Sequence, residues 1–305
     1  MDIIAKMNTL AAQISWDLSL SINMKRTQKK ICNKPQFMQI HKTIGISLLI
    51  LFFLILSTTY SEATIVVLNG LTHEKQIHPG ETYRGTIQIQ NTAKKEKSVR
   101  VYQKDYWFSH TGESKHDPTG TLPRSNGSWI SFSPELLTLG PNQITTVNFE
   151  VKVPENDTLR GTYWSVLMVE GITPPDTSNF NSGVTINTAI RYAVQVITNI
   201  GNSGKNDIQF LGLNLDKQQE QNVLDVIIKN TGERILKPEM SIELFDSSGE
   251  TVAVIKAEKR KTFPGTSIRV QLILEGVKPG NYTGVLIADC GEDNIFGTNL
   301  SLEIG

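Results

Sequence analysis

One stretch of the sequence occurs twice, and this repeat constrains the fold more than any other feature. The first copy spans residues 138–169 and the second, shorter copy spans residues 262–288. Each copy contains a proline turn, four apolar residues at every second position, and then a proline, a glycine and a tyrosine in that order. Alternation with a period of two is typical of β-strands that bury one face, and proline and glycine mark turns. The repeat therefore predicts two β domains in tandem.

A second pair of matching segments supports this duplication. Val226, Ile228 and Asn230-Thr231 match Ile87, Ile89 and Asn91-Thr92 in spacing and chemistry. Asparagine tolerates positive φ and bonds to nearby backbone, which suits a chain that leaves a sheet at a corner. From Thr64 onward apolar residues mostly alternate and turn residues interrupt them regularly, so we predict strands and no helix.

The N-terminal part has the features of an export signal. Residues 44–56 are almost entirely apolar and follow several basic residues. This run has the length of a signal-peptide core, about 7 to 15 residues, whereas a membrane span needs about 20. Small residues at Ser61 and Ala63 predict cleavage after Ala63. Export to the periplasm or cell surface is the first expectation, and a membrane anchor formed by residues 44–56 is the alternative.

Charge and cysteine content exclude several classes of protein. The sequence has 30 basic and 30 acidic residues, and the leader contains more of the basic ones, so the mature chain is mildly acidic. This balance argues against a nucleic-acid partner. Cys32 lies in the leader and Cys290 stands alone in the mature chain, which leaves no internal disulfide.

Motifs for catalysis and for cofactor binding are missing from the sequence. It contains no Gly-x-Ser-x-Gly, no phosphate-binding glycine loop, no His-Glu-x-x-His and no Cys-x-x-Cys. We therefore predict a protein that is not an enzyme and has no cofactor.

Several motifs of the first repeat resemble a known superfamily. They are Ile87-x-Ile89-x-Asn91, Trp129-Ile130-Ser131-Phe132-Ser133-Pro134, Leu139-Gly140-Pro141-Asn142-Gln143, Val151-x-Val153-Pro154 and Gly161-Thr162-Tyr163-Trp164. Residues 64–200 with these motifs resemble the PapD-like periplasmic pilus chaperones. The chain is also similar to two-domain extracellular proteins of Gram-positive bacteria that bind cell-wall-associated partners. The resemblance implies a protein that binds other proteins and catalyses no reaction.

The resemblance implies an all-β fold of two tandem immunoglobulin-like β-sandwich domains after an N-terminal hydrophobic helix. The expected division is a signal region at 1–63, a PapD-like domain at 64–201 and a second immunoglobulin-like domain at 202–305. In sandwiches of this kind a tyrosine near one corner bonds back to the backbone upstream of it. We predict this role for Tyr163 and Tyr282.

A long β pattern at residues 184–200 is the candidate partner-binding strand. An extended peptide can add to an exposed sheet edge, where main-chain bonds supply affinity and alternate side chains supply specificity. The alternative is that the same apolar face packs into the domain's own core. The candidate residues are Val184, Ile186, Ile190, Arg191, Tyr192, Val194 and Val196.

An insertion at residues 106–129 contains two histidines and two carboxylates close together in sequence. His110, Glu113, His116 and Asp117 could ligate a metal, but their spacing matches no zinc or calcium signature. Glycines and prolines predict a long surface loop and no metal site. An enzyme would require an organised polar pocket around His110 and His116.

Two functions remain open on the sequence alone. The first is an exported binding or assembly protein, chaperone-like, whose partner is another envelope or surface protein, with a fibre subunit as one candidate. The second is a structural envelope module held by residues 44–56, which is also the chain's only expected contact with the membrane.

Overall fold

Seventeen strands and one short 3₁₀ helix make up the described part of the chain, and it contains no α-helix. The computed structural model describes residues 64–172, 190–218 and 221–305. The predicted signal at 1–63 lies outside these residues. Among the described residues, no helix has the length and apolar character that a membrane span requires. They belong to one compact unit that spans residues 62–305.

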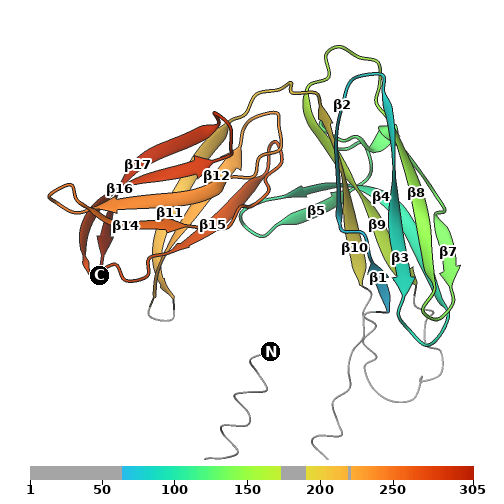
Figure 1. The fold of residues 1–305 in the computed structure, drawn as a ribbon, viewed down its shortest axis with the longest axis horizontal. Helices are drawn as coiled ribbons and strands as arrows, with labels where there is room; N and C mark the ends of the chain where they lie inside the picture. The colour runs from blue at the N-terminus through green and yellow to red at the C-terminus, as the bar shows by residue number, and fades with distance from the viewer. Residues whose placement is uncertain (1–63, 173–189, 219–220) are drawn as a thin grey trace, which may run out of the picture. The chain divides into compact units, whose positions relative to one another are not determined.

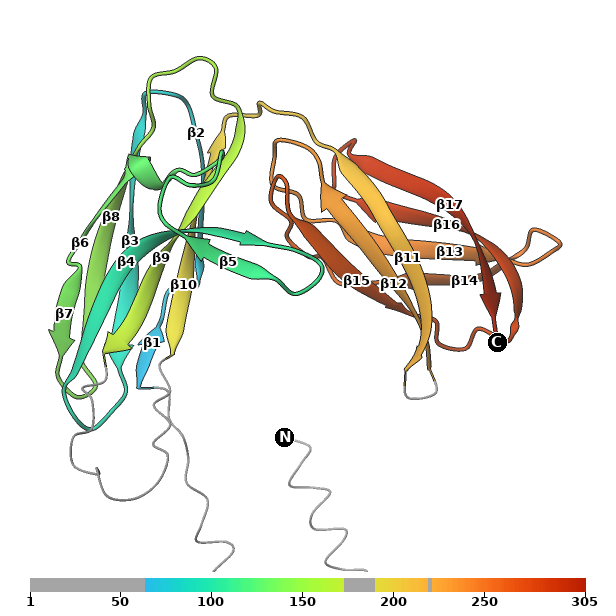
Figure 2. The same cartoon turned by 180° about the vertical axis from the view of Figure 1, so that it is seen from behind.

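The first half of this unit is a sandwich of two sheets (Figure 1, Figure 2). One sheet has the order β1 (Ile65–Val67), β3 (Thr82–Asn91), β8 (Ile144–Lys152) and β6 (Ile130–Ser133). The other has the order β2 (Thr72–Ile77), β10 (Arg191–Ile200), β9 (Gly161–Ile172), β4 (Lys97–Phe108) and β5 (Ser114–Asp117), with β7 (Leu136–Leu139) also paired to β4. The 3₁₀ turn η1 (Gly127–Trp129) precedes β6.

The second half is another sandwich. Its sheets have the orders β11 (Ile208–Gln218), β12 (Gln221–Asn230), β15 (Ser267–Ile273), and β14 (Thr251–Lys256), β13 (Glu239–Phe245), β16 (Gly280–Asp289), β17 (Ile295–Ile304). Each sandwich has its own core of alternating residues, such as Ile87, Ile89 and Val147 in the first and Val226, Ile228 and Val270 in the second. The all-β prediction of two immunoglobulin-like sandwiches is confirmed for the described residues. The exact boundary at residues 201 and 202 stays a prediction.

The chain changes sheets between β1 and β2. β1 pairs with β3 in the first sheet, whereas β2 runs parallel to β10 in the second. Every other ladder between the described strands is antiparallel. At the crossing, Asn69 accepts a hydrogen bond from the Gln88 N–H and donates one to the Thr86 carbonyl. The Asn69 side chain thereby forms hydrogen bonds with the backbone of β3 where the main chain turns away from this strand.

The proline turn of the repeat has the same geometry in both sandwiches. Pro141 is followed by Asn142 at φ 58°, and Pro264 is followed by Gly265 at φ 78°. The residue after each turn donates its N–H to the residue before the proline, at 3.1 and 3.0 Å. Proline at the second position and positive φ at the third are the requirements of a type II turn.

The two Asn-Thr corners are also equivalent. Asn91 and Asn230 are fully buried. Each side-chain amide donates to the carbonyl four residues later, Lys95 at 2.8 Å and Arg234 at 2.7 Å, and to a carbonyl beside the proline turn. Each side-chain oxygen accepts an N–H two residues later. One buried amide therefore joins two turns in each sandwich.

The predicted tyrosine corner is present in only one sandwich. The Tyr282 hydroxyl donates to the Lys278 carbonyl at 2.9 Å, as predicted. The prediction is wrong for Tyr163, whose hydroxyl has no hydrogen bond within the described residues. Its ring instead packs against Trp129 at 4.7 Å and beneath the Arg124 guanidinium.

We predict that Asn91→Ala and Asn230→Ala each lower the free energy of unfolding by about 2 to 3 kcal/mol, because buried carbonyls lose their donor. Urea unfolding measures this loss. Asn281→Ala, at an exposed position, is the control and should cost little. A corner variant as stable as this control would show that the corner amides are dispensable.

Candidate functional site

The residues of the predicted binding strand do not share one surface. Val184 and Ile186 lie outside the described residues. Ile190 is 46% exposed, and Arg191 is exposed at the start of β10. Tyr192 is half-buried and packs against the core of the first sandwich.

Val194 and Val196 are fully buried in the core of the first sandwich. This placement agrees with the alternative that the apolar face of this strand packs into its own domain. Polar replacement of these two valines would therefore disrupt the core and could not report on partner binding. Whether the strand binds a partner stays a prediction, because strand addition uses the backbone.

The backbone of β10 is paired unequally on its two sides. β9 pairs with β10 along its whole length, from Arg191 to Ile200. β2 covers the other side only from Gln195 onward. Residues 191–194 therefore have no strand partner on this side within the described part of the chain. We call these four residues the open edge of β10.

A groove of about 600 Å³ lies beside this open edge. It is lined by alternate residues of β4 (Tyr102, Lys104 and Tyr106), by consecutive residues of β10 (Arg191, Tyr192 and Ala193) and by the hairpin strand β5 (Ser114 and His116). We call this hollow the β10 groove.

Glu170 organises the cations at one end of the β10 groove. It accepts a hydrogen bond from Arg191 at 2.9 Å and lies 3.5 Å from the Arg100 guanidinium. Burial acts to raise the pKa of Glu170, but hydrogen bonds from Arg191 and Tyr102 and the nearby positive charges hold the pKa below its ordinary value. The carboxylate therefore stays ionised and fixes the position of Arg191.

Farther along the groove lies the Lys104 ammonium, which has no ion pair among the described residues. Burial and the neighbouring Lys104 lower the pKa of His116, although Asp117 opposes them. A neutral imidazole beside an ammonium group and two phenols offers hydrogen-bond donors with little negative charge. Such a lining suits the carbonyls and acidic side chains of a polypeptide.

A second hollow continues the groove toward the second sandwich. It shares Tyr106, Ser114 and Gln195 with the β10 groove and adds Arg260 and Lys261. The Lys261 ammonium lies 3.4 Å from the side-chain oxygen of Gln195. Burial and the nearby Lys237 lower the pKa of Lys261, and Glu74 opposes them.

The insertion at residues 106–129 is more ordered than the predicted surface loop. Ser114–Asp117 forms β5 and pairs with β4 as a hairpin. His110 reaches the second sandwich, with its Nδ1 2.9 Å from the Ser267 hydroxyl oxygen. Glu113 pairs with Lys115 instead of a histidine. No cluster of potential metal ligands occurs within the residues the structure describes.

Aromatic rings join the two sandwiches. Trp164 of β9 stacks on Phe263 with ring centroids 4.7 Å apart, and Phe108 meets Phe263 edge-on. The Thr162 N–H donates to the Glu233 carbonyl at 2.8 Å, and the Ile235 N–H donates to the Thr162 hydroxyl at 2.8 Å. Single-sequence reasoning missed this junction, because Trp164 and Phe263 have the same pattern as residues of a domain core.

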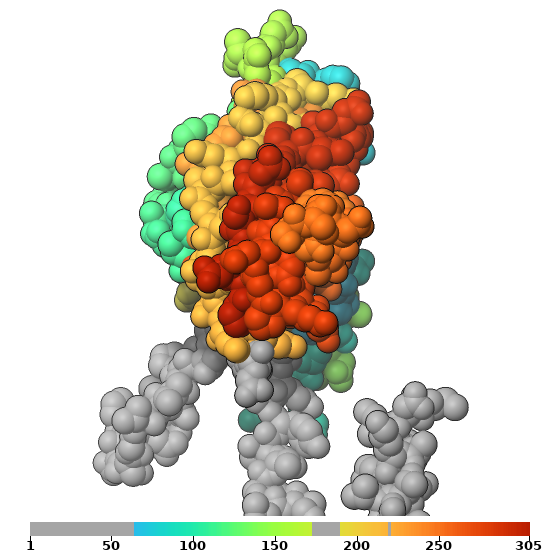
Figure 3. All heavy atoms as spheres, turned by 90° about the vertical axis from the view of Figure 1, so that its left-hand side faces the viewer, coloured from blue at the N-terminus to red at the C-terminus, as the bar shows by residue number. Residues whose placement is uncertain are grey.

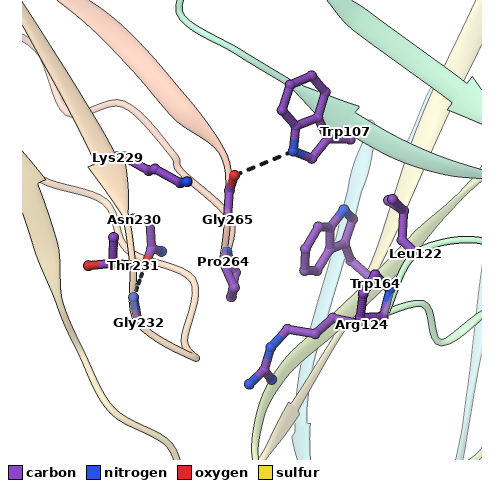
Figure 4. A pocket seen from close by; sticks show the side chains of 11 residues that line it. Trp107, Leu122, Arg124, Trp164, Lys229, Asn230, Thr231, Gly232, Pro264 and Gly265 are labelled. Carbon is purple, nitrogen blue, oxygen red and sulfur yellow. Dashed lines mark hydrogen bonds between the residues drawn. The ribbon is translucent and has the colours of Figure 1, made fainter. Parts of the chain in front are cut away.

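A pocket of about 490 Å³ opens at this junction (Figure 4). Trp107, Trp164 and Arg124 line it from the first sandwich, opposite the turns that contain Gly232 and Gly265. The Trp107 indole N–H donates to the Gly265 carbonyl across the junction at 3.4 Å. Arg124 forms an ion pair with Glu233 at 3.1 Å. These contacts make the pocket a part of the joint between the sandwiches.

No protein-family model and no curated protein sequence matches this chain. Among solved structures, fimbrial chaperones are similar to this chain at low sequence identity. A chain from a chaperone–tip adhesin complex of CFA/I fimbriae is 13% identical, with coverage of 80% of this chain and all of that one and a TM-score of 0.42. The class 5 fimbrial chaperone CfaA is 12% identical, with coverage of 77% and 98% and the same TM-score. The Pseudomonas aeruginosa chaperone CupB2 is 10% identical, with coverage of 78% and 100% and a TM-score of 0.34.

Fimbrial chaperones are the group that the sequence motifs resemble, and at 10–13% identity and TM-scores of 0.34–0.42 this likeness concerns the fold alone and carries no argument about superfamily or role.

We predict that Gly161→Ala destabilises the protein by about 2 kcal/mol more than Gly249→Ala, because only the first change overpacks a contact. Both glycines have positive φ, 75° and 85°. A Cβ at Gly161 would lie 2.1 Å from the Glu233 carbonyl oxygen, whereas one at Gly249 meets nothing within 4 Å. Thermal and urea unfolding measure both losses. Equal losses of stability would mean that the backbone at Glu233 moves aside at little cost, and would contradict the prediction.

We also predict that His73 makes stability fall as the pH drops below 6.5, its ordinary pKa. Its ring packs edge-on against Phe149 at 5.2 Å, and its Nε2 is buried without a partner in the described residues. Burial lowers the pKa of His73, so the folded state disfavours the protonated form and the unfolded state gains on acidification. His73→Phe should flatten the pH dependence of the unfolding free energy, and an unchanged pH dependence in this variant would contradict the prediction.

Proposed function

We propose that this chain is an exported, non-enzymatic binding protein of the cell envelope with a chaperone-like role. Its partner is an extended polypeptide segment of another envelope or surface protein, and it binds by adding a strand to the first sandwich. One observation carries the proposal: the open edge of β10 lies directly beside the β10 groove.

The two parts of the site contribute different things to binding. The N–H and C=O groups of Arg191 and Ala193 point away from β9 and offer hydrogen bonds to any incoming strand, each with a net contribution of about 1 kcal/mol. Side chains of that strand alternate, so every second one faces the groove. There the phenols of Tyr102 and Tyr106 and the ammonium of Lys104 favour aromatic or acidic side chains. Main-chain bonds thus give affinity and the groove gives selectivity.

The predicted export signal, the charge of the mature chain and the lining of the groove support the other parts of the proposal. The predicted signal at residues 44–56 supports an envelope location, and the mild acidity of the mature chain supports a protein partner over a nucleic acid. Ser114 and His116 both line the groove, but no hydrogen bond joins them among the described residues, so they do not form the paired nucleophile and base of a hydrolytic site. Protein binding is the function that this lining supports best.

A photo-crosslinking amino acid at Ile190, which borders the open edge, tests the proposal in envelope extracts. It should capture a discrete polypeptide, whereas the same group at Ile144, 54% exposed at the start of β8, should not. In the recovered complex, amide hydrogen exchange should slow at Arg191 and Ala193, because an added strand protects the N–H groups that point away from β9, as that of Gln195 does toward Leu71.

Two results would contradict strand addition. One is capture of the same polypeptides from both positions, which would indicate non-specific contact. The other is a specific complex whose slowed amides lie on a different strand, which would place the binding site elsewhere on the molecule.

A further inference from the structure

The last strand of the second sandwich has an edge that nothing covers in the described part of the chain. β17 pairs with β16 over ten residues and with no other described strand. Atoms of β16 and β17, coloured red, lie at the surface on this side of the molecule (Figure 3). In the first sandwich, the corresponding last strand, β10, has β2 along much of its outer side. Both sandwiches thus have this last strand, but only the first has a further strand paired to its outer edge among the described residues.

β17 also lacks the features that normally keep an edge strand from pairing with another chain. Charged residues, proline and bulges are the usual protection. β17 contains one charged residue, Glu303, with no proline, and its ladder with β16 has no register shift. The edge strand β11 carries Asp216 and Lys217 and has a bulge near Phe210, and the ladder of β14 also shifts register. The remaining edge strand, β15, is also regular but is only seven residues long, so β17 is the longest edge of its sandwich without this protection.

The inward row of β17 is incompletely buried. Phe296, Leu300 and Leu302 face the core but are only half-buried, whereas Leu286 and Ala288 of the neighbouring β16 are fully buried. An additional strand at this edge would remove apolar surface from water, at about 25 cal/mol per Å². Hydrogen bonding and apolar burial both favour an occupant here.

We infer that this occupant is β17 of a second copy of the chain, paired antiparallel about a two-fold axis perpendicular to the sheet. With Asn299 on the axis, the strand is complementary to itself. Outward residues then meet outward residues, with Ile295 opposite Glu303 and Gly297 opposite Ser301. The two four-stranded sheets that contain β17 become one continuous eight-stranded sheet.

The same register matches the inward row and separates the charges. Phe296 lies opposite Leu302, and Thr298 lies opposite Leu300, so apolar side chains meet apolar side chains or a threonine methyl. Glu303 of one copy is distant from Glu303 of the other, because the two lie at opposite ends of the paired strands. Like charges directly opposite each other would destabilise a ladder, and this register contains none. The dimer involves a different sandwich from the β10 groove and does not depend on the proposed function.

Sedimentation velocity of the full chain over a wide range of concentration tests the inference. The wild-type protein should shift from monomer to dimer as its concentration rises. Asn299→Lys should weaken the dimer about fivefold or more, because two lysines meet on the axis. Thr283→Lys introduces the same charge at an exposed site on β16, one strand inside the edge, and should leave the dimer unchanged.

A mixture of two variants separates lost pairing from lost folding. Asn299→Asp should also impair self-association, but Asn299→Lys mixed with Asn299→Asp should form a heterodimer, since opposite charges then meet on the axis. A wild-type chain that stays monomeric at every concentration would overturn the inference and leave β17 to a different polypeptide or to solvent. A dimer that is indifferent to Asn299→Lys, or a mixture that stays monomeric, would overturn it as well.

Discussion

The buried side-chain amide of Asn230 is the interaction on which most of this structure depends. It donates to the carbonyl of Arg234 and to that of Thr262, and so holds the corner after β12 against the proline turn before β15. The main chain of the same residue accepts the Gly265 N–H, so the two turns are linked twice. These turns also meet the first sandwich: Glu233 binds Thr162, Phe263 stacks on Trp164, and the Gly265 carbonyl accepts Trp107. A corner that closes one sandwich thereby positions the other.

This junction determines which part of the first sandwich is left to bind a partner. The outer face of the β10–β9–β4 sheet is apolar near Trp164 and Ile197, where Phe263 covers it. Farther along the same strands it becomes polar and aromatic, with Tyr102, Lys104 and Arg191 around the β10 groove. The covered and the open regions are thus two ends of one sheet face. The second sandwich buries the apolar end of this face, whose exposure to water would cost free energy, and leaves exposed the polar end, whose groups can form hydrogen bonds.

Local pattern was enough to predict the strands, the duplication and the proline turns, because each of these depends on residues close together in sequence. The face and the pairing of the binding strand were harder. Parity places Val194 and Val196 on one side of β10, but parity alone cannot say whether that side is core or surface. Their burial depends on β3 and β8, which lie far away in the sequence, and the cover on the edge depends on β2. The polar sequence of β2, Thr-His-Glu-Lys-Gln-Ile, has a single buried residue and gives little strand signal. The β5 hairpin was missed for a similar reason, since its glycine and proline neighbours are typical of a loop.

The two sandwiches differ most where their first strands end, and a local cause explains the difference. In the first sandwich Gly70, at φ 85°, redirects the chain after β1, and the Asn69 side chain replaces the main-chain bonds that β3 would otherwise lose. The chain is then free to run alongside β10 as β2. In the second sandwich β11 meets only a bulge between Phe210 and Gly212 and continues along β12 for its full length. A bulge bends a strand without changing its partner. A crossing whose lost main-chain hydrogen bonds are replaced by a side chain, as at Asn69, lets the chain continue in the opposite sheet. Among the described residues, the last strand is consequently covered from Gln195 onward in one sandwich and unpaired along ten residues on its outer side in the other, which makes the edges of these related domains suited to different partners.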